Sequence, residues 1–428
     1  MVKERPEHIL LGCVADDFTG ASDAASFLAG RGIKTLLFNG TPDGHEILQD
    51  CAAVVIALKT RSIPADEAVR ETLKAVRWLE QHGAEQLYLK YCSTFDSTPE
   101  GNIGPDIDAV LEAYKIPYTI LCPALPVNRR IVKDGILIVD DKPVAEGHMA
   151  NHPLNPIWDS RIEELMRPQG KYPCMILDGP LLARTREAIL EEVEKFGKDK
   201  AHFYIIPDYT TDAQGKKIAD VFGDNRLLTG GSGILEHLAE RYKERYDCAA
   251  GQALPTGTPG KGVALSGSCS MATCGQCKAY AEGHRTFSVD PKRILDGSLT
   301  AEDLWKFITE SGEDSLVYSA GATDPQSRIY ADEETAERAA KALEQTLAAL
   351  AKKAFEAGYT RIIAAGGETS GAVALELGFD GFIIGESIAP GVPVMIPLNH
   401  QNIRIALKSG NFGQPDFFER ALAVMKAD

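Results

Sequence analysis

The sequence predicts an α/β protein of two domains, each a mostly parallel sheet flanked by helices, with an interdomain cleft. Short apolar runs alternate with amphipathic stretches along most of the 428 residues, which is typical of parallel sheets covered by helices. One Gly- and Pro-rich stretch without periodicity, residues 248–261, interrupts this alternation and is interpreted as a linker. The domains are therefore expected at residues 1–247 and 262–428. Ligands often bind between domains, so we expect them in the cleft.

Apolar runs of strand length occur throughout the first domain. The helix after residue 63 begins with Pro64 and two acids and stops near Gly83, which are ordinary start and stop signals. Asp134-Gly135 lies between two β-rich runs and predicts a hairpin. We expect strands at 9–15, 34–39, 53–58, 86–91, 118–123, 173–178 and 203–207.

The second domain repeats the alternation. A helix over 333–357 has apolar side chains at helical spacing and ends at Gly358. We expect strands at 262–266, 315–319, 361–365 and 381–384, and a further one ending near Leu407.

Charge and composition exclude some classes of protein. The net charge is −16, with 44% apolar and 25% charged residues, which argues against nucleic acid or an anionic membrane as the main partner. No run approaches the roughly 20 apolar residues of a membrane span, and the apolar run near the N-terminus is too short for a signal peptide. The expected location is the cytoplasm. Nine cysteines, an odd number, indicate reduced thiols, several of them buried, rather than disulfides.

Three predicted strands of the first domain end in polar loops, and the carboxyl ends of parallel strands share one edge of a sheet. Arg or Lys at that edge suits a carboxylate, and Asp suits hydroxyl groups, so we expect a site for a small, oxygenated anion. Two simpler interpretations are alternatives to such a site. Asp16 and Asp17 cap the following helix, and Lys90 is a solvated surface lysine. The polar residues are Asp16, Asp17 and Thr19, then Lys59 and Arg61, then Lys90, Ser93, Thr94, Asp96, Ser97 and Asn102.

Three Gly-rich turns follow strands of the second domain: "LSGSCSMAT", "AAGGETSGAV" and "LKSGNFGQPDFF". Backbone N–H groups at such turns bind phosphate, so the three together favour a nucleotide site. The sequence has neither a P-loop motif nor a G-x-G-x-x-G after a strand.

Two patterns resemble metal sites but are interpreted otherwise, and no metal ligand is predicted. Cys269, Cys274 and Cys277 have ferredoxin-like spacing, but no fourth cysteine follows. His148 and His152 are four residues apart, but Pro153 disfavours a regular helix there. His148 is therefore a candidate substrate contact in a loop.

The motifs "GCVADDFTGASDAASFL", "KYCSTFDSTPEGNIGP", "GHMANHPLNP", "AAGGETSGAV" and "KSGNFGQPDFF" together resemble the four-carbon acid sugar kinase family, and within it the 3-oxo-tetronate kinase branch. The resemblance implies that the first domain binds the acid sugar, that the second binds ATP, and that the C4 hydroxyl is phosphorylated. It implies acid-sugar contacts at Asp16, Asp17, Arg61, Lys90, Ser93 and Asp96. It implies ATP contacts at Ser266, Gly267, Ser268, Gly366, Gly367, Glu368, Thr369 and Gly410.

Phosphoryl transfer needs an oriented hydroxyl and positive charge around the moving group. We assign the base that accepts the hydroxyl proton to Asp17, with Asp16 second and Asp96 third. Arg61 and Lys90 either hold the substrate carboxylate or neutralise the γ-phosphate, and Mg²⁺ is expected with ATP. The sequence departs from the family at Arg129, where we expect the glycine of an Asn-Gly-Arg turn.

Other functions remain open at this point. A D-threonate or D-erythronate 4-kinase shares the same domains. A non-catalytic sugar-acid binding protein needs no nucleotide turns and commonly has an export signal, and a nicotinamide-dependent dehydrogenase lacks its fingerprint here. The expected partner is a small-molecule acid sugar, and assembly into a homo-oligomer is left open.

Overall fold

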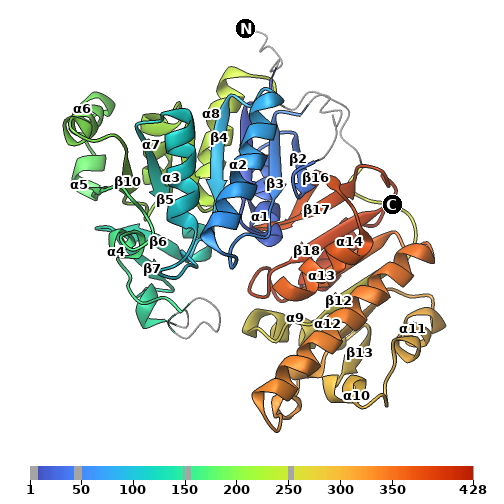
Figure 1. Ribbon diagram of the computed structural model, residues 1–428. Helices are drawn as coiled ribbons and strands as arrows, with labels where there is room; N and C mark the ends of the chain where they lie inside the picture. Colours follow the sequence, from blue (N-terminus) through green and yellow to red (C-terminus); the bar gives the residue numbers. More distant parts are fainter. Residues whose placement is uncertain (1–7, 43–50, 148–149, 151–155, 249–254, 428) are drawn as a thin grey trace. The chain divides into compact units, whose positions relative to one another are not determined.

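The computed structural model describes residues 8–42, 51–147, 150, 156–248 and 255–427 (Figure 1). The chain divides into two compact units, Met1–Gly251 and Gln252–Asp428. The division falls within the stretch interpreted as a linker.

The first unit contains a parallel sheet with the strand order β2-β3-β1-β4-β11-β5-β10-β9. Each predicted strand is present, with ends shifted by at most two residues, whereas β11 was not predicted because its apolar run is very short. The strands are β1 (Leu11–Ala15), β2 (Thr35–Asn39), β3 (Ala53–Ala57), β4 (Gln86–Lys90), β5 (Tyr118–Cys122), β9 (Cys174–Leu177), β10 (Phe203–Pro207) and β11 (Leu227–Gly230).

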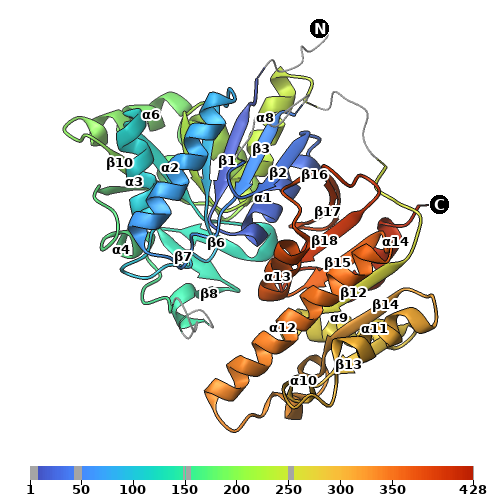
Figure 2. The ribbon, with the colours of Figure 1, turned by 45° about the vertical axis from the view of Figure 1, so that its right-hand side comes forward.

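Helices cover both faces of this sheet. The crossover from β1 to β2 and that from β3 to β4 run in opposite directions along the sheet, so right-handed connections place α1 and α2 on opposite faces. The helices α2 and α3 lie side by side (Figures 1 and 2). The helices are α1 (Phe18–Gly30), α2 (Ala65–Gln81), α3 (Ile103–Tyr114), α4 (Ile162–Met166), α5 (Gly179–Leu182), α6 (Arg186–Gly197), α7 (Asp212–Phe222) and α8 (Gly233–Arg245).

The predicted hairpin is confirmed as β6 (Arg130–Lys133) and β7 (Ile136–Val139), followed by β8 (Lys142–Pro143). Asp134 and Gly135 have φ values of 53° and 73°, as a two-residue type I′ turn requires. Arg129 also has a left-handed φ of 60°, a conformation that glycine adopts without strain. This explains physically why a glycine is expected there.

The second unit contains a mixed sheet with the order β13-β14-β12-β15-β18-β17-β16. The first five strands are parallel, whereas β17 runs antiparallel to β16 and β18. The strands are β12 (Gly262–Ser266), β13 (Arg285–Val289), β14 (Ser315–Ser319), β15 (Arg361–Ala365), β16 (Gly381–Ala389), β17 (Val392–Pro397) and β18 (Arg404–Lys408). A mixed α/β architecture with mostly parallel sheets flanked by helices is therefore confirmed.

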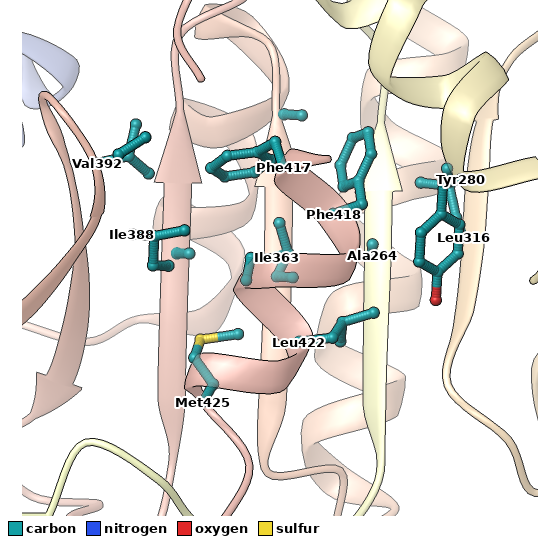
Figure 3. Close-up of a cluster of buried hydrophobic side chains, with 14 of the residues drawn as sticks. Ala264, Tyr280, Leu316, Ile363, Ile388, Val392, Phe417, Phe418, Leu422 and Met425 are labelled. Carbon is teal, nitrogen blue, oxygen red and sulfur yellow. The ribbon is translucent and has the colours of Figure 1, made fainter. Parts of the chain in front are cut away.

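Two groups of helices flank the second sheet. The long helix α12 packs along α13 (Figure 2). On the other face, α14 inserts Phe417, Phe418 and Leu422 into a buried cluster over the strands, and Met425, which directly follows the helix, joins them (Figure 3). The helices are α9 (Met271–Ala281), α10 (Pro291–Leu295), α11 (Ala301–Glu310), α12 (Glu333–Glu356), α13 (Gly367–Leu377) and α14 (Phe417–Val424).

Five of the nine cysteines are buried, which agrees with the prediction that several thiols lie in the core. Burial raises the pKa of Cys13 and Cys122 to about 12, so these thiols stay protonated at neutral pH. Among the described helices, none is long and apolar enough to cross a membrane.

Candidate active site

Three adjacent strands of the first unit, β3, β1 and β4, end at the same edge of the sheet. Asp16 follows β1, Lys90 is the last residue of β4, and Arg61 follows β3 after a short loop. The backbone N–H groups of Thr60 and Arg61 donate to the Asp16 carbonyl at 3.0 and 3.3 Å. The predicted convergence of these loops is therefore seen in the structure.

Arg61 holds both neighbouring carboxylates. Its Nε and Nη2 donate to the two oxygens of Asp16 at 2.9 and 2.8 Å, a bidentate pair of fixed geometry. Its Nη2 also lies 2.9 Å from Asp17 Oδ1. Burial opposes the charged form of Arg61, but Asp16 and Asp17 raise its pKa well above the ordinary value, so the guanidinium remains charged.

Lys90 lies inside the same cluster. Only 4% of the residue is exposed, so its interpretation as a solvated surface lysine is wrong. A Cβ atom added at Gly20 would lie 2.4 Å from Asp17 Oδ1, 3.2 Å from Lys90 Nζ and 3.7 Å from Arg61 Nη2. The three charged groups thus converge above Gly20, where a larger residue would displace them.

Asp17 caps the following helix, as one interpretation of the sequence has it, and its side chain is also partly accessible. Its Oδ1 accepts a hydrogen bond from Gly20 N at 2.6 Å and so caps α1. Its side chain is nevertheless 31% exposed, against 10% for Asp16. Of these two carboxylates, Asp17 is therefore the more accessible to a substrate.

The loop after β4 places Asp96 at the border of the cluster. Phe95, buried and with a left-handed φ of 53°, anchors this loop in the core. Asp96 Oδ2 lies 3.9 Å from Arg61 Nη1, while its buried Oδ1 has no partner among the described residues. Ser93 lies elsewhere on the loop, where its Cβ is 3.5 Å from a Cβ added at Gly231.

The second unit contains a cavity of about 300 Å³ at the carboxyl ends of β12, β14 and β15. It brings together six of the predicted ATP contacts: Gly267, Ser268, Gly366, Gly367, Glu368 and Thr369. Ser266 is completely buried at the end of β12 and does not line the cavity. Gly410 does not line the cavity either; a Cβ atom added there would lie 2.7 Å from Ser268 Oγ and 3.0 Å from Ser270 Oγ.

The comparisons with known proteins cover both units. A family model described as a sugar-binding N-terminal domain matches residues 11–238, and one described as a nucleotide-binding C-terminal domain matches residues 263–418. The chain belongs to the four-carbon acid sugar kinase family.

Individual relatives of this kinase family match nearly end to end. A 3-oxo-tetronate kinase of Actinobacillus succinogenes is 41% identical over 96% of this chain and 99% of that protein. One of Haemophilus influenzae is 39% identical over 96% and 99%. A solved structure from Salmonella typhimurium LT2 superimposes with a TM-score of 0.86 at 39% identity, covering 97% of this chain and 99% of that one.

Within this kinase chain, the sequence analysis missed a buried pair beside Lys90. The Ser232 hydroxyl donates to Asp23 Oδ2, and both residues are buried. Burial raises the pKa of Asp23, and Lys90 partly opposes that rise. Ser232 lies in the turn "TGGSG" after β11, and a Gly-rich turn at a strand end is a signal that could have revealed it.

Asp106 is a second acid that the sequence analysis missed. It lines a small cavity of about 20 Å³ with Asp16 and Lys90, space for about one water molecule. Burial, followed by a lesser effect of Asp16, raises the pKa of Asp106 to about 7, although the Thr72 hydroxyl opposes the rise. No motif marks this residue, because α3 brings it to the site from a helix.

The cavity of the second unit is also lined by residues that no motif indicated. Arg328 comes from the segment between β14 and α12, and Glu344 comes from α12 itself. Burial and then Glu368 raise the pKa of Glu344. Apolar surface is supplied by Pro291, Tyr330, Ala336, Ala340 and Leu343.

The structure describes the three cysteines of the ferredoxin-like pattern but not the two histidines. Cys274 and Cys277 lie on α9, and burial raises the pKa of Cys277 to about 12. Cys274 Sγ accepts a hydrogen bond from Arg328 Nη2 at 3.3 Å, and Cys269 lines the nucleotide cavity. His148 and His152 lie outside the described residues.

The "GGETSG" turn gives a testable contrast between two adjacent glycines. Gly366 has a φ of 118°, which side chains rarely adopt, whereas Gly367 is not among the positive-φ glycines and a Cβ added there meets no atom within 4 Å. We expect Gly367→Val to weaken ATP binding at least tenfold with an unchanged melting temperature, because the side chain only fills the cavity. Gly366→Val should lower the melting temperature by several degrees, since strained backbone costs about 1–3 kcal/mol.

Calorimetric ATP titrations and thermal melts of both variants test this contrast. Acid-sugar binding by the first unit serves as the control and should persist in Gly367→Val. Equal loss of both ligands in that variant would contradict the assignment of this turn to the nucleotide.

Proposed function

We propose that this protein is an ATP-dependent kinase that phosphorylates the C4 hydroxyl of a 3-oxo-tetronate. The observation that carries the proposal is the full-length similarity to 3-oxo-tetronate kinases at about 40% identity. Two features of the structure support it: the charged cluster around Gly20 in the first unit, and the Gly-lined cavity in the second.

Asp17 is the proposed base. Its partly exposed carboxylate orients the C4 hydroxyl and accepts the proton as the oxygen attacks the γ-phosphorus. The bond between the γ-phosphorus and the bridging oxygen breaks, ADP leaves, and the 4-phosphate forms. Arg61 binds Asp16 and Asp17 together and thereby holds the base in position.

Lys90 is the proposed cation for the reacting groups. Arg61 is already occupied by two carboxylates, whereas the Lys90 ammonium donates to the Tyr91 carbonyl at 2.9 Å and lies next to the proposed base. Positive charge at this point stabilises the charge that develops on the transferring phosphoryl group. ATP enters as its Mg²⁺ complex, which is the substrate form of such reactions.

ADP release in the presence of a panel of four-carbon acids tests the function directly. We expect ATP turnover with a 3-oxo-tetronate well above the background without an acid, and a product phosphorylated at C4. Preferred turnover of D-threonate or D-erythronate would support the alternative kinase. ADP release that no acid stimulates, or phosphate on C2, would contradict the proposal.

A cytoplasmic location and assembly into a homo-oligomer remain predictions. A small-molecule acid sugar remains the proposed partner, with no role for nucleic acid or membrane.

A further inference from the structure

Lys408, the last residue of β18, is completely buried, with an exposed fraction of 0%. Its ammonium donates to Thr273 Oγ1 at 2.9 Å and to the carbonyl oxygens of Ser409 and Gly410, each at 3.1 Å. All three acceptors are uncharged.

The surroundings of Lys408 supply no negative charge. The groups facing it are Thr273 and the Cys277 thiol from α9, the two carbonyls of its own turn, and the Phe417 ring of α14, whose centroid lies 5.5 Å away. Among the described residues, no carboxylate forms an ion pair with it. A buried cation without a counter-charge is costly to a protein, so this one calls for an explanation.

Lys408 also joins the three Gly-rich turns. Its backbone carbonyl accepts a hydrogen bond from Gly366 N at 2.8 Å, while its ammonium holds the Gly410 carbonyl. Ser270 Oγ donates to the same Gly410 carbonyl at 2.5 Å, and Ser268 Oγ donates to Ser270 Oγ at 3.2 Å. The charge is thus located where the Gly410 turn meets the turns of Ser268 and Gly366, which line the cavity.

We propose that Lys408 is the built-in counter-charge for the nucleotide phosphates, acting across the Gly410 turn as a positioning residue. This inference rests on the proposed function, because it takes ATP as the ligand of the cavity. The phosphates of ATP supply the negative charge that the surroundings of Lys408 lack. The free-energy cost of burying the ammonium is therefore offset only when ATP is bound.

Lys408 is expected to couple ATP binding to the uptake of a proton. Burial lowers the pKa of Lys408 to about 8, an effect that Cys277 slightly opposes, so the free protein loses this charge in mildly alkaline solution. A bound polyphosphate favours the charged form and raises the pKa again. ATP binding above pH 8 must therefore take up a proton, and ATP affinity must fall as the pH rises.

Calorimetric titration of the wild-type protein with Mg²⁺–ATP tests this linkage without any substitution. Between pH 7.5 and 9.0 we expect the dissociation constant to rise by about eightfold if the bound lysine regains its ordinary pKa. Titrations at pH 9.0 in buffers of different ionisation heat should show uptake of nearly one proton. Phosphate groups lose their last proton near pH 6, so ATP itself does not contribute.

Two substitutions test whether Lys408 is the group that makes ATP affinity depend on pH. Lys408→Met should weaken ATP binding about tenfold or more at pH 7.5 and abolish the pH dependence, because the side chain keeps its length but has no charge. Lys278→Met removes an exposed lysine from α9 and should change neither quantity.

An affinity in the wild type that is constant from pH 7.5 to 9.0, or binding without proton uptake, would overturn the inference. Persistence of the pH dependence in Lys408→Met would also overturn it and would assign the effect to another group. If Lys408→Met does not fold, the number of protons that the wild-type protein takes up on binding ATP at pH 9.0 tests the inference by itself. ADP release with a 3-oxo-tetronate at pH 7.5 tests the proposed function separately, so either can fail alone.

Discussion

Asp17→Asn is expected to lower kcat by about 10²–10⁴-fold while the protein remains folded. The substitution removes the proposed proton acceptor, and loss of a general base typically has an effect of this size. Asparagine is as good an N-cap as aspartate, so the hydrogen bond from Gly20 N that caps α1 can be retained. Steady-state kinetics together with circular dichroism and thermal melts provide the measurement.

A matched control separates catalysis from capping. Asp178 caps α5 through a hydrogen bond from Leu181 N at 2.9 Å, and it lies outside the charged cluster around Gly20. Asp178→Asn should therefore keep wild-type kcat. If Asp17→Asn retains more than about a third of wild-type kcat, Asp17 is not the base, and the same measurement on Asp16→Asn and Asp96→Asn becomes decisive.

Lys90→Met should lower kcat by about 10²–10³-fold, a larger change than any rise in the KM for the acid. The ammonium lies beside the proposed base above Gly20, so its charge acts mainly on the transferring phosphoryl group, and loss of such a donor has an effect of this order. Methionine is used because a glutamate at this buried position would face Asp16, Asp17 and Asp23. Both kinetic parameters are measured at fixed ionic strength.

Lys59→Met provides the comparison, since Lys59 follows β3 at the same edge of the sheet and is exposed. It should leave both parameters within about threefold of wild type. A Lys90→Met variant that raises only the KM for the acid would place Lys90 at the substrate carboxylate. If neither parameter changes by more than about threefold, Lys90 has no part in the reaction.

Strand positions in the parallel parts of the sheets could be predicted, because buried parallel strands are continuous apolar runs. The exceptions have physical reasons. The strand β17 contains two prolines, Pro393 and Pro397, which argue against a central strand in sequence analysis. At the edge of its sheet, β13 is only partly buried, so its apolar pattern is weak.

Residues of the site that follow strands could likewise be predicted, since topology alone brings strand ends together. Asp106 and Glu344 could not, because they reach their cavities from helices that pack across other elements. The burial of Lys408 could not be predicted from the sequence either. Its place after an apolar strand predicts a solvent-facing end, and only the packing of α9 and α14 against the turn encloses it.

In the parallel sheet of the first unit, the charged cluster and the turn that leads into β4 lie at opposite ends of that strand. Lys90 stands at one end of β4, and the turn that joins α2 to this strand, around Gly83, stands at the other end. Five residues of strand span roughly 15 Å, a fixed length set by the backbone ladder. A spectroscopic probe attached at Glu85, which is exposed in this turn, would therefore be held at a near-constant distance from the charged cluster around Gly20. This turn offers a place to attach a reporter of ligand binding without disturbing the charges that bind the ligand.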